Sequence, residues 1–254
     1  PRSRFRRVRA GGLVIAVRIP SILVVLAVAL VVGACSSDDT SAPPALPADP
    51  EVIRAEASRA MGNVESARFS IERGGEVVHI DDAGTLAFER AEGRFAAPAS
   101  SDALITIGAG GTKIEVGAVA VDGTTWITNP VTGKWEVAPK NLAFDPATMF
   151  DPELGWRPLL ATGLSNTRLT TPEPDEDGRY HLQGNADSER ISVLTGGLVE
   201  QSVPVDLWID ADTGLVAEAR FRAGAPSGPS TWRLLLSEYG TDIEVERPQL
   251  DADS

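Results

Sequence analysis

Few residues of this chain have both the type and the spacing that chemistry requires. The 254 residues include one cysteine, Cys35, and two histidines, His79 and His181. A zinc site needs several His, Cys or carboxylate ligands at short spacing, and a hydrolase needs a nucleophile with a base beside it. The sequence holds no such cluster, nucleophile elbow, phosphate-binding loop or dinucleotide-binding motif. We therefore expect no enzyme, no metal site and no cofactor.

Cys35 is the residue with the clearest chemistry. It follows the small pair Gly33-Ala34 and the apolar run 19–32, and six arginines precede that run. A basic segment, an apolar segment and a small-residue cleavage site make up an export signal. A cysteine directly after such a site resembles the lipobox of bacterial lipoproteins. This resemblance implies that residues 1–34 are a signal peptide and that Cys35 is acylated, for example by palmitate.

The alternative is a free thiol at the end of a transmembrane helix. Arg18 and Pro20 interrupt the apolar run, and what remains is shorter than the roughly 20 apolar residues that a bilayer span needs. The lipoprotein interpretation is therefore favoured.

Charge limits the partners of the mature chain. The chain has 23 basic and 36 acidic side chains, and the six arginines of the signal leave 17 basic residues, a net charge near −19. Phosphate repels such a surface, so we expect no nucleic-acid partner and attachment to the cell membrane through the lipid anchor, on the extracytoplasmic face. A single cysteine also excludes an internal disulfide. Residues 35–48 predict a lipidated, solvated tether, and residues 49–250 predict one folded domain.

The domain begins with a helix and continues with strands. Asp49-Pro50 is a capped helix start, and Ile53, Ala57 and Met61 recur at helical spacing. From Ala67 the apolar period changes to two, with glycine-containing turns between the strands. Between Asn141 and Gly163 an apolar, proline-containing segment interrupts this pattern, and we expect a short helix from Asp151 that ends before Gly163. Asp187 predicts a cap for another short helix, and Pro204 predicts an edge strand or a bulge.

The fold class that follows is α+β, in one domain. We expect a strongly curved antiparallel half-barrel with helices packed on its concave face, because one face of nearly every strand is apolar. Three short helices are too few to fill the inside of so wide a sheet. Either the sheet closes tightly on itself or a hydrophobic cavity remains between the sheet and the helices.

The apolar alternating residues are the candidates for lining such a cavity. The sheet wall would consist of Ile71, Leu86, Phe88, Ile114, Val116, Trp126, Val205, Leu207, Ile209 and Trp232. The cover would consist of Met149, Phe150, Trp156, Leu159 and Leu160. The alternative is that these residues form a solid core.

Several stretches resemble the LppX/LprG-type (LppX_LprAFG) lipoproteins of actinobacterial envelopes, which are distantly similar in fold to the LolA/LolB carriers. They are VAVDGTTWI at 119–127, GKWEVAP at 133–139, SERISVLTGGLV at 188–199 and VPVDLWIDADTGLVAEARF at 203–221, together with the lipobox.

The resemblance implies lipid binding and transport. Family members bind multiply acylated lipids or glycolipids of the triacylglycerol or phosphatidylinositol-mannoside type, and a major facilitator exporter accompanies one branch. The chain would then carry such a lipid across the space outside the membrane. A non-enzymatic envelope scaffold or transporter partner with a filled core is the second hypothesis, and a lipid hydrolase is the third.

Overall fold

One folded domain accounts for the part of the chain that the computed structural model describes, residues 48–81, 83–139, 145–225 and 228–250. The expected signal peptide, Cys35 and nearly all of the tether lie outside these residues. The helical segments are α1 (Pro50–Met61), η1 (Pro146–Phe150), α2 (Trp156–Pro158), η2 (Leu159–Gly163) and α3 (Ser188–Leu194). The strands are β1 (Ser66–Gly75), β2 (Leu86–Ala96), β3 (Ser100–Ala109), β4 (Thr112–Val121), β5 (Thr124–Thr128), β6 (Trp135–Val137), β7 (Leu164–Leu169), β8 (Arg179–Ala186), β9 (Val203–Asp210), β10 (Val216–Ala225) and β11 (Gly228–Ser237).

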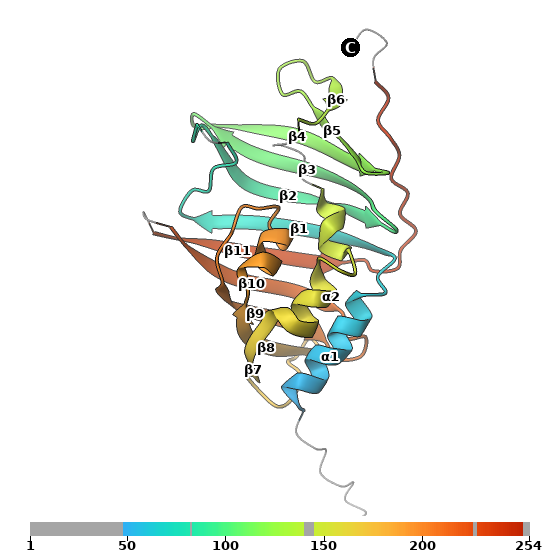
Figure 1. Ribbon diagram of the computed structural model, residues 1–254, viewed down its shortest axis with the longest axis vertical. Helices are drawn as coiled ribbons and strands as arrows, with labels where there is room; N and C mark the ends of the chain where they lie inside the picture. The colour runs from blue at the N-terminus through green and yellow to red at the C-terminus, as the bar shows by residue number, and fades with distance from the viewer. Residues whose placement is uncertain (1–47, 82, 140–144, 226–227, 251–254) are drawn as a thin grey trace, which may run out of the picture. The chain divides into compact units, whose positions relative to one another are not determined.

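The strands form one antiparallel sheet in the order β6-β5-β4-β3-β2-β1-β11-β10-β9-β8-β7 (Figure 1). Short turns join most neighbours, which is why they pair antiparallel. Because β1 and β11 are neighbours in the middle, two meanders run outward from the centre. The chain must cross from the β6 edge to the β7 edge, and it does so through η1, α2 and η2, the crossing segment 146–163. The expected curved, single-domain α+β fold is confirmed, and the sheet is open rather than closed.

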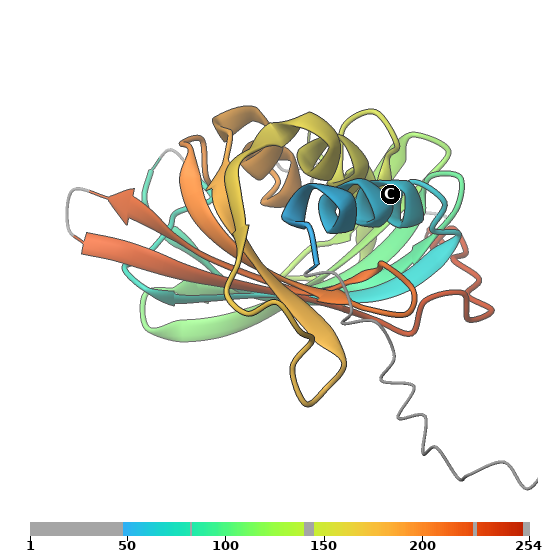
Figure 2. The same ribbon diagram turned by 90° about the horizontal axis from the view of Figure 1, so that it is seen from below.

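The helical segments lie on the side toward which the sheet curls, as the second view shows (Figure 2). The crossing segment contacts β2 and β3 through η1 and contacts β7 through η2, while α1 packs against α2 and η2. We call this covered side the inner face and the opposite side the outer face.

The expected caps are present on α1 and α3. The side chain of Asp49 accepts a hydrogen bond from the Glu51 amide at 2.8 Å, and Asp187 accepts one from the Arg190 amide at 2.8 Å. Each cap pairs one of the free amides at a helix start. The caps thereby set where each helix enters the inner layer.

The crossing segment differs from the sequence expectation. Asp151 does not begin a helix; its side chain accepts from the amides of Glu153 and Leu154 in a tight turn. Helix α2 begins only at Trp156, and Gly163 lies inside the π-helical turn η2 rather than beyond the helix end. Asp at an N-cap and Asp in such a turn make the same hydrogen bonds, so the residue type alone does not separate them.

Pro204 is not at a sheet edge, because β9 lies between β8 and β10. Pro204 pairs with Asn185 of β8, whereas the register with β10 extends only as far as Val205 opposite Phe221. The strand therefore accommodates a residue without an amide proton just outside the β10 ladder.

Candidate functional site

The inner face carries an unbroken apolar row across eight strands. Directly paired residues of neighbouring strands point to the same side of a sheet. The register therefore aligns Leu182, Leu207, Ala219, Leu234, Ile71, Ala91, Ile105 and Val116, from β8 across the centre to β4. Four of these strands come from each half of the chain. The row joins the two meanders into one apolar surface.

The wall candidates of the sequence analysis lie on this face, with one exception. Val205, Leu207 and Ile209 are 1–2% exposed and follow one another along β9. Phe88, Trp232 and Phe221 stack in a line, with ring centroids 5.6 and 6.0 Å apart. The remaining wall candidates on this face, Ile71, Leu86, Ile114 and Val116, range from buried to half-buried.

Trp126 is the exception, because the register places it on the outer face. Trp126 pairs with Val119, and Val119 pairs with Asp102, which forms an ion pair with Arg94. Ile127, one position later, pairs with Ala118 and points inward. Both residues are apolar, so alternation alone does not tell which one faces the core. A shift of one residue exchanges the two faces of a strand.

The cover candidates belong to the crossing segment and are all buried. Met149, Trp156, Leu159 and Leu160 are 0–1% exposed. Phe150 stacks on Phe95 of β2 with ring centroids 4.4 Å apart. The five cover residues therefore form an apolar layer above the sheet, and their contact with a ligand stays a prediction.

Sequence reasoning missed several residues of the same buried cluster. Phe69, Phe95, Phe221, Leu182 and Leu234 are all at most 5% exposed. A β-bulge between Phe88 and Arg90 reverses the alternation in β2, and a second between Val216 and Glu218 does so in β10. Beyond a bulge the period-two pattern changes face, so a strict alternation follows only part of such a strand.

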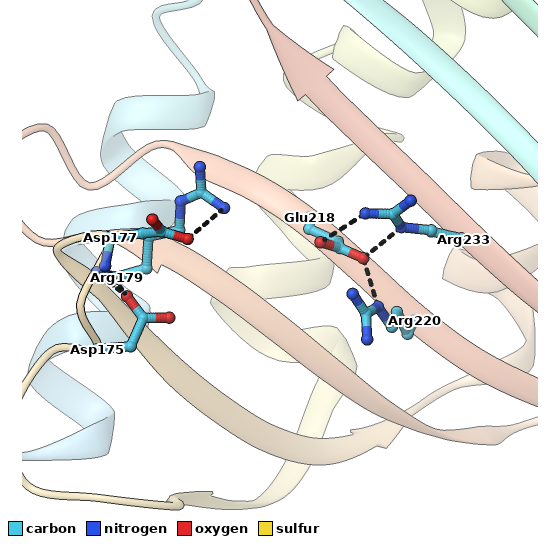
Figure 3. Close-up of polar contacts among 6 residues, drawn as sticks. All are labelled: Asp175, Asp177, Arg179, Glu218, Arg220 and Arg233. Carbon is cyan, nitrogen blue, oxygen red and sulfur yellow. Dashed lines mark hydrogen bonds and ion pairs between the residues drawn. The ribbon is translucent and has the colours of Figure 1, made fainter.

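The second bulge turns Glu218 to the outer face, where it is nearly enclosed. Figure 3 shows its carboxylate between Arg220 and Arg233, which both donate to it. The Glu218 side chain is 6% exposed, and the two arginine side chains are about half exposed. Burial alone would raise the pKa of Glu218, but the hydrogen bonds from Arg233 and Arg220 outweigh it and lower the pKa. The same figure shows Arg179 beside Asp175 and Asp177 in the β7–β8 turn.

The two histidines lie apart from the inner face. His79 is exposed beside β2, and its backbone bridges to Ala87. His181 pairs with Trp208 and accordingly faces outward, where its Nε2 lies 2.7 Å from an oxygen of Asp206.

Among the described residues, no group of three His, Cys, Asp or Glu side chains could hold a metal ion. Within the same residues, no helix has the length and apolar character of a membrane span.

Together, the fold and the site define a half-barrel whose inner apolar face is covered by helices. Residues 49–245 match the family described as LppX_LprAFG lipoprotein, and the chain belongs to that family. The fold is similar to the crystal structure of LprF from Mycobacterium bovis, with a TM-score of 0.58 and 16% identity over 78% of this chain and 96% of LprF. The lipoprotein LppX of Mycobacterium tuberculosis gives a TM-score of 0.53 and 14% identity over 78% of this chain and all of LppX. No curated protein sequence matches the chain.

Proposed function

We propose that this chain binds an acylated lipid between the inner face of the sheet and the crossing segment, and carries it outside the cell membrane without a covalent step. The observation that carries the proposal is the apolar row that spans eight strands of the inner face. Membership of a lipoprotein family supports it. Acylated Cys35 would hold the domain at the extracytoplasmic surface.

The energetics of acyl chains favour such a carrier. Each CH₂ group withdrawn from water contributes roughly 0.8 kcal/mol, so a single long chain exposed to water costs on the order of 10 kcal/mol. A carrier must therefore surround the chains with apolar side chains and leave the headgroup in water. Lipids with several chains, of the triacylglycerol or phosphatidylinositol-mannoside type, benefit most from an apolar surface this wide. A major facilitator exporter would be a suitable source of such a lipid.

Small side chains occur on both halves of the inner face. Ala91, Ala103, Ala118 and Ala219 all lie on this face by register and are buried. An alanine occupies less of the wall than a leucine would, so a ligand has fewer wall atoms to displace at these positions. Their placement on both halves of the sheet favours a binding space that extends across the centre.

The test is the lipid content of the purified protein and of two matched variants. Val116 points inward from β4 and is 8% exposed, whereas its neighbour Glu115 points outward and is exposed. We expect native mass spectrometry to find co-purified lipid in the wild type, several-fold less in Val116→Trp and an unchanged amount in Glu115→Trp. A wild-type protein without lipid, isolated from its own host, would contradict the proposal and favour the scaffold hypothesis.

A further inference from the structure

One buried donor on the inner side has no protein partner. Trp156, the first residue of α2, is 1% exposed. Its indole Nε1 is the one enclosed side-chain nitrogen or oxygen that lacks a hydrogen-bond partner among the residues that the structure describes. Buried indole N–H groups normally find an acceptor, and an enclosed donor without one is destabilising. A phenylalanine would fill much of the same space without that penalty.

A second buried tryptophan shows the usual arrangement. The indole of Trp232, which is 2% exposed, donates to the hydroxyl of Ser230 at 2.9 Å, and Ser230 is itself buried. The chain thus provides an acceptor for the indole of β11 but none among its described residues for that of α2. The contrast leaves the indole of Trp156 available to an acceptor on a bound ligand.

The backbone that carries the indole is tightly fixed. Gly155 precedes it, and a Cβ at Gly155 would lie 1.9 Å from the carbonyl oxygen of Met149. Only glycine allows the chain to pass this close to η1, so the start of α2 is held against the cover. A donor held in this way is preorganised for its acceptor, because little side-chain freedom is lost when the bond forms.

The surroundings select the chemistry of the acceptor. Helix α2 packs against α1, α3, η1 and η2, whose cover residues Met149, Phe150, Leu159 and Leu160 are buried and apolar. The buried Ser58 hydroxyl of α1 already donates to the carbonyl of Arg157. A phosphate or a sugar would bring charge or several hydroxyls that this layer could not satisfy. A carbonyl of an acyl ester is neutral, needs one donor and is attached to the chains that the apolar wall would bind.

We propose that the indole N–H of Trp156 donates a hydrogen bond to an ester carbonyl of the bound lipid. This inference rests on the proposed function and adds to it that the ligand is an ester whose linkage lies beneath the crossing segment. Ether-linked or plain hydrocarbon chains would fit the same wall but would leave the indole unpaired.

The experiment compares a triacylglycerol with its triether analogue of the same chain length. Binding is measured to the delipidated protein as wild type, Trp156→Phe and Trp208→Phe, because Trp208 lies on the outer face beside His181. We expect the wild type to bind the ester about tenfold more tightly, as one hydrogen bond in an apolar interior predicts. Trp156→Phe should lose this preference, and Trp208→Phe should retain it. In ¹⁵N spectra of the wild type, one indole resonance should shift with the ester and not with the ether.

The outcomes separate the two proposals. If the wild type binds neither lipid, the proposed function fails and this inference fails with it. If the wild type binds both lipids equally, and no indole resonance distinguishes them, only this inference fails. The wild-type spectra and affinities decide the question even if Trp156→Phe does not fold.

Discussion

At the scale of single residues, the enclosed carboxylate of Glu218 is the clearest source of a pH-dependent stability. The pKa of Glu218 is lowered in the folded protein because Arg233 and Arg220 donate to its ionised form. A lowered carboxyl pKa adds stability that is complete above the unfolded value, near 4.5, and is lost as the pH falls through the folded value. We expect Glu218→Gln to lower the free energy of unfolding by about 1–3 kcal/mol at pH 7.

The difference between Glu218→Gln and the wild type should shrink below about pH 4.5, where the Glu218 carboxylate of the unfolded chain begins to protonate while that of the folded protein stays ionised. Urea denaturation at pH 7 and at progressively lower pH measures this. Glu238→Gln is the matched control, because the Arg68–Glu238 ion pair is about half exposed and such pairs contribute little. Equal losses for the two variants at pH 7, or a Glu218 effect that does not change with pH, would contradict the argument.

Gly93 of β2 is a second residue whose type is set by its surroundings. A Cβ there would lie 2.7 Å from Cζ of Phe69 and 2.0 Å from the carbonyl oxygen of Asp102. The ring of Phe69 thus packs across the bare backbone of the neighbouring strand. We expect Gly93→Ala to cost about 1–3 kcal/mol through overpacking, measured as a lower denaturation midpoint. Gly110→Ala in the β3–β4 turn is the comparison, because a Cβ there meets no other atom. Its loss of stability measures the effect of backbone conformation alone, without overpacking.

At the scale of elements, Asp145 joins the crossing segment to the sheet. Its side chain accepts from the Ala147 amide at 2.9 Å, which begins η1, and from the Ser101 hydroxyl of β3 at 3.1 Å. Asp145→Ala removes both bonds, so we expect a loss of about 1–2 kcal/mol. Hydrogen exchange should accelerate over 146–163 while the central strands stay protected.

The matched control for that prediction is Asp151→Ala in the same segment. The Asp151 side chain accepts from the amides of Glu153 and Leu154 in its own turn, and within the described part of the chain it makes no hydrogen bond to the sheet. Its loss should speed exchange locally around that turn. Identical exchange patterns in the two variants would show that Asp145 does not hold the cover on β3.

Sequence reasoning predicted the elements that depend on local chemistry. The caps of α1 and α3 and the apolar alternation of β9 need only neighbouring residues, and all three are present. The face of Trp126 and the path of the crossing segment depend on pairing with distant strands, which no local pattern contains. Phe95 of β2 was missed for a related reason, because the bulge after Phe88 moves the inner positions of that strand from even to odd numbers.

At the scale of the whole molecule, the two meanders meet at the β1–β11 pair, so the inner face is complete only when both halves of the chain have folded. The crossing segment then covers it from one edge of the sheet to the other. Alternation predicted the apolar surface, but the spatial order of the strands came only from the structure. A lipid site built in this way depends on the entire domain rather than on a local motif.

Attachment to the membrane is the remaining property at this scale, and we propose that it depends on Cys35. Residues 35–254 carry 36 acidic against 17 basic side chains, a net charge that repels anionic headgroups. We expect an alkyne analogue of palmitate, fed to the host, to label the wild type and leave Cys35→Ala unlabelled. Intact-mass measurement should show that the wild type begins at residue 35 and that the variant keeps residues 1–34.

Ser36→Ala is the matched control, because it changes the neighbouring position and leaves the thiol in place. It should be labelled and processed like the wild type. A single acyl chain gives only weak and reversible membrane binding, so stable anchoring needs at least a second chain at the new N-terminus. The mass of the wild type should therefore exceed that of residues 35–254 by more than one acyl group, and label that persists in Cys35→Ala would place the anchor elsewhere.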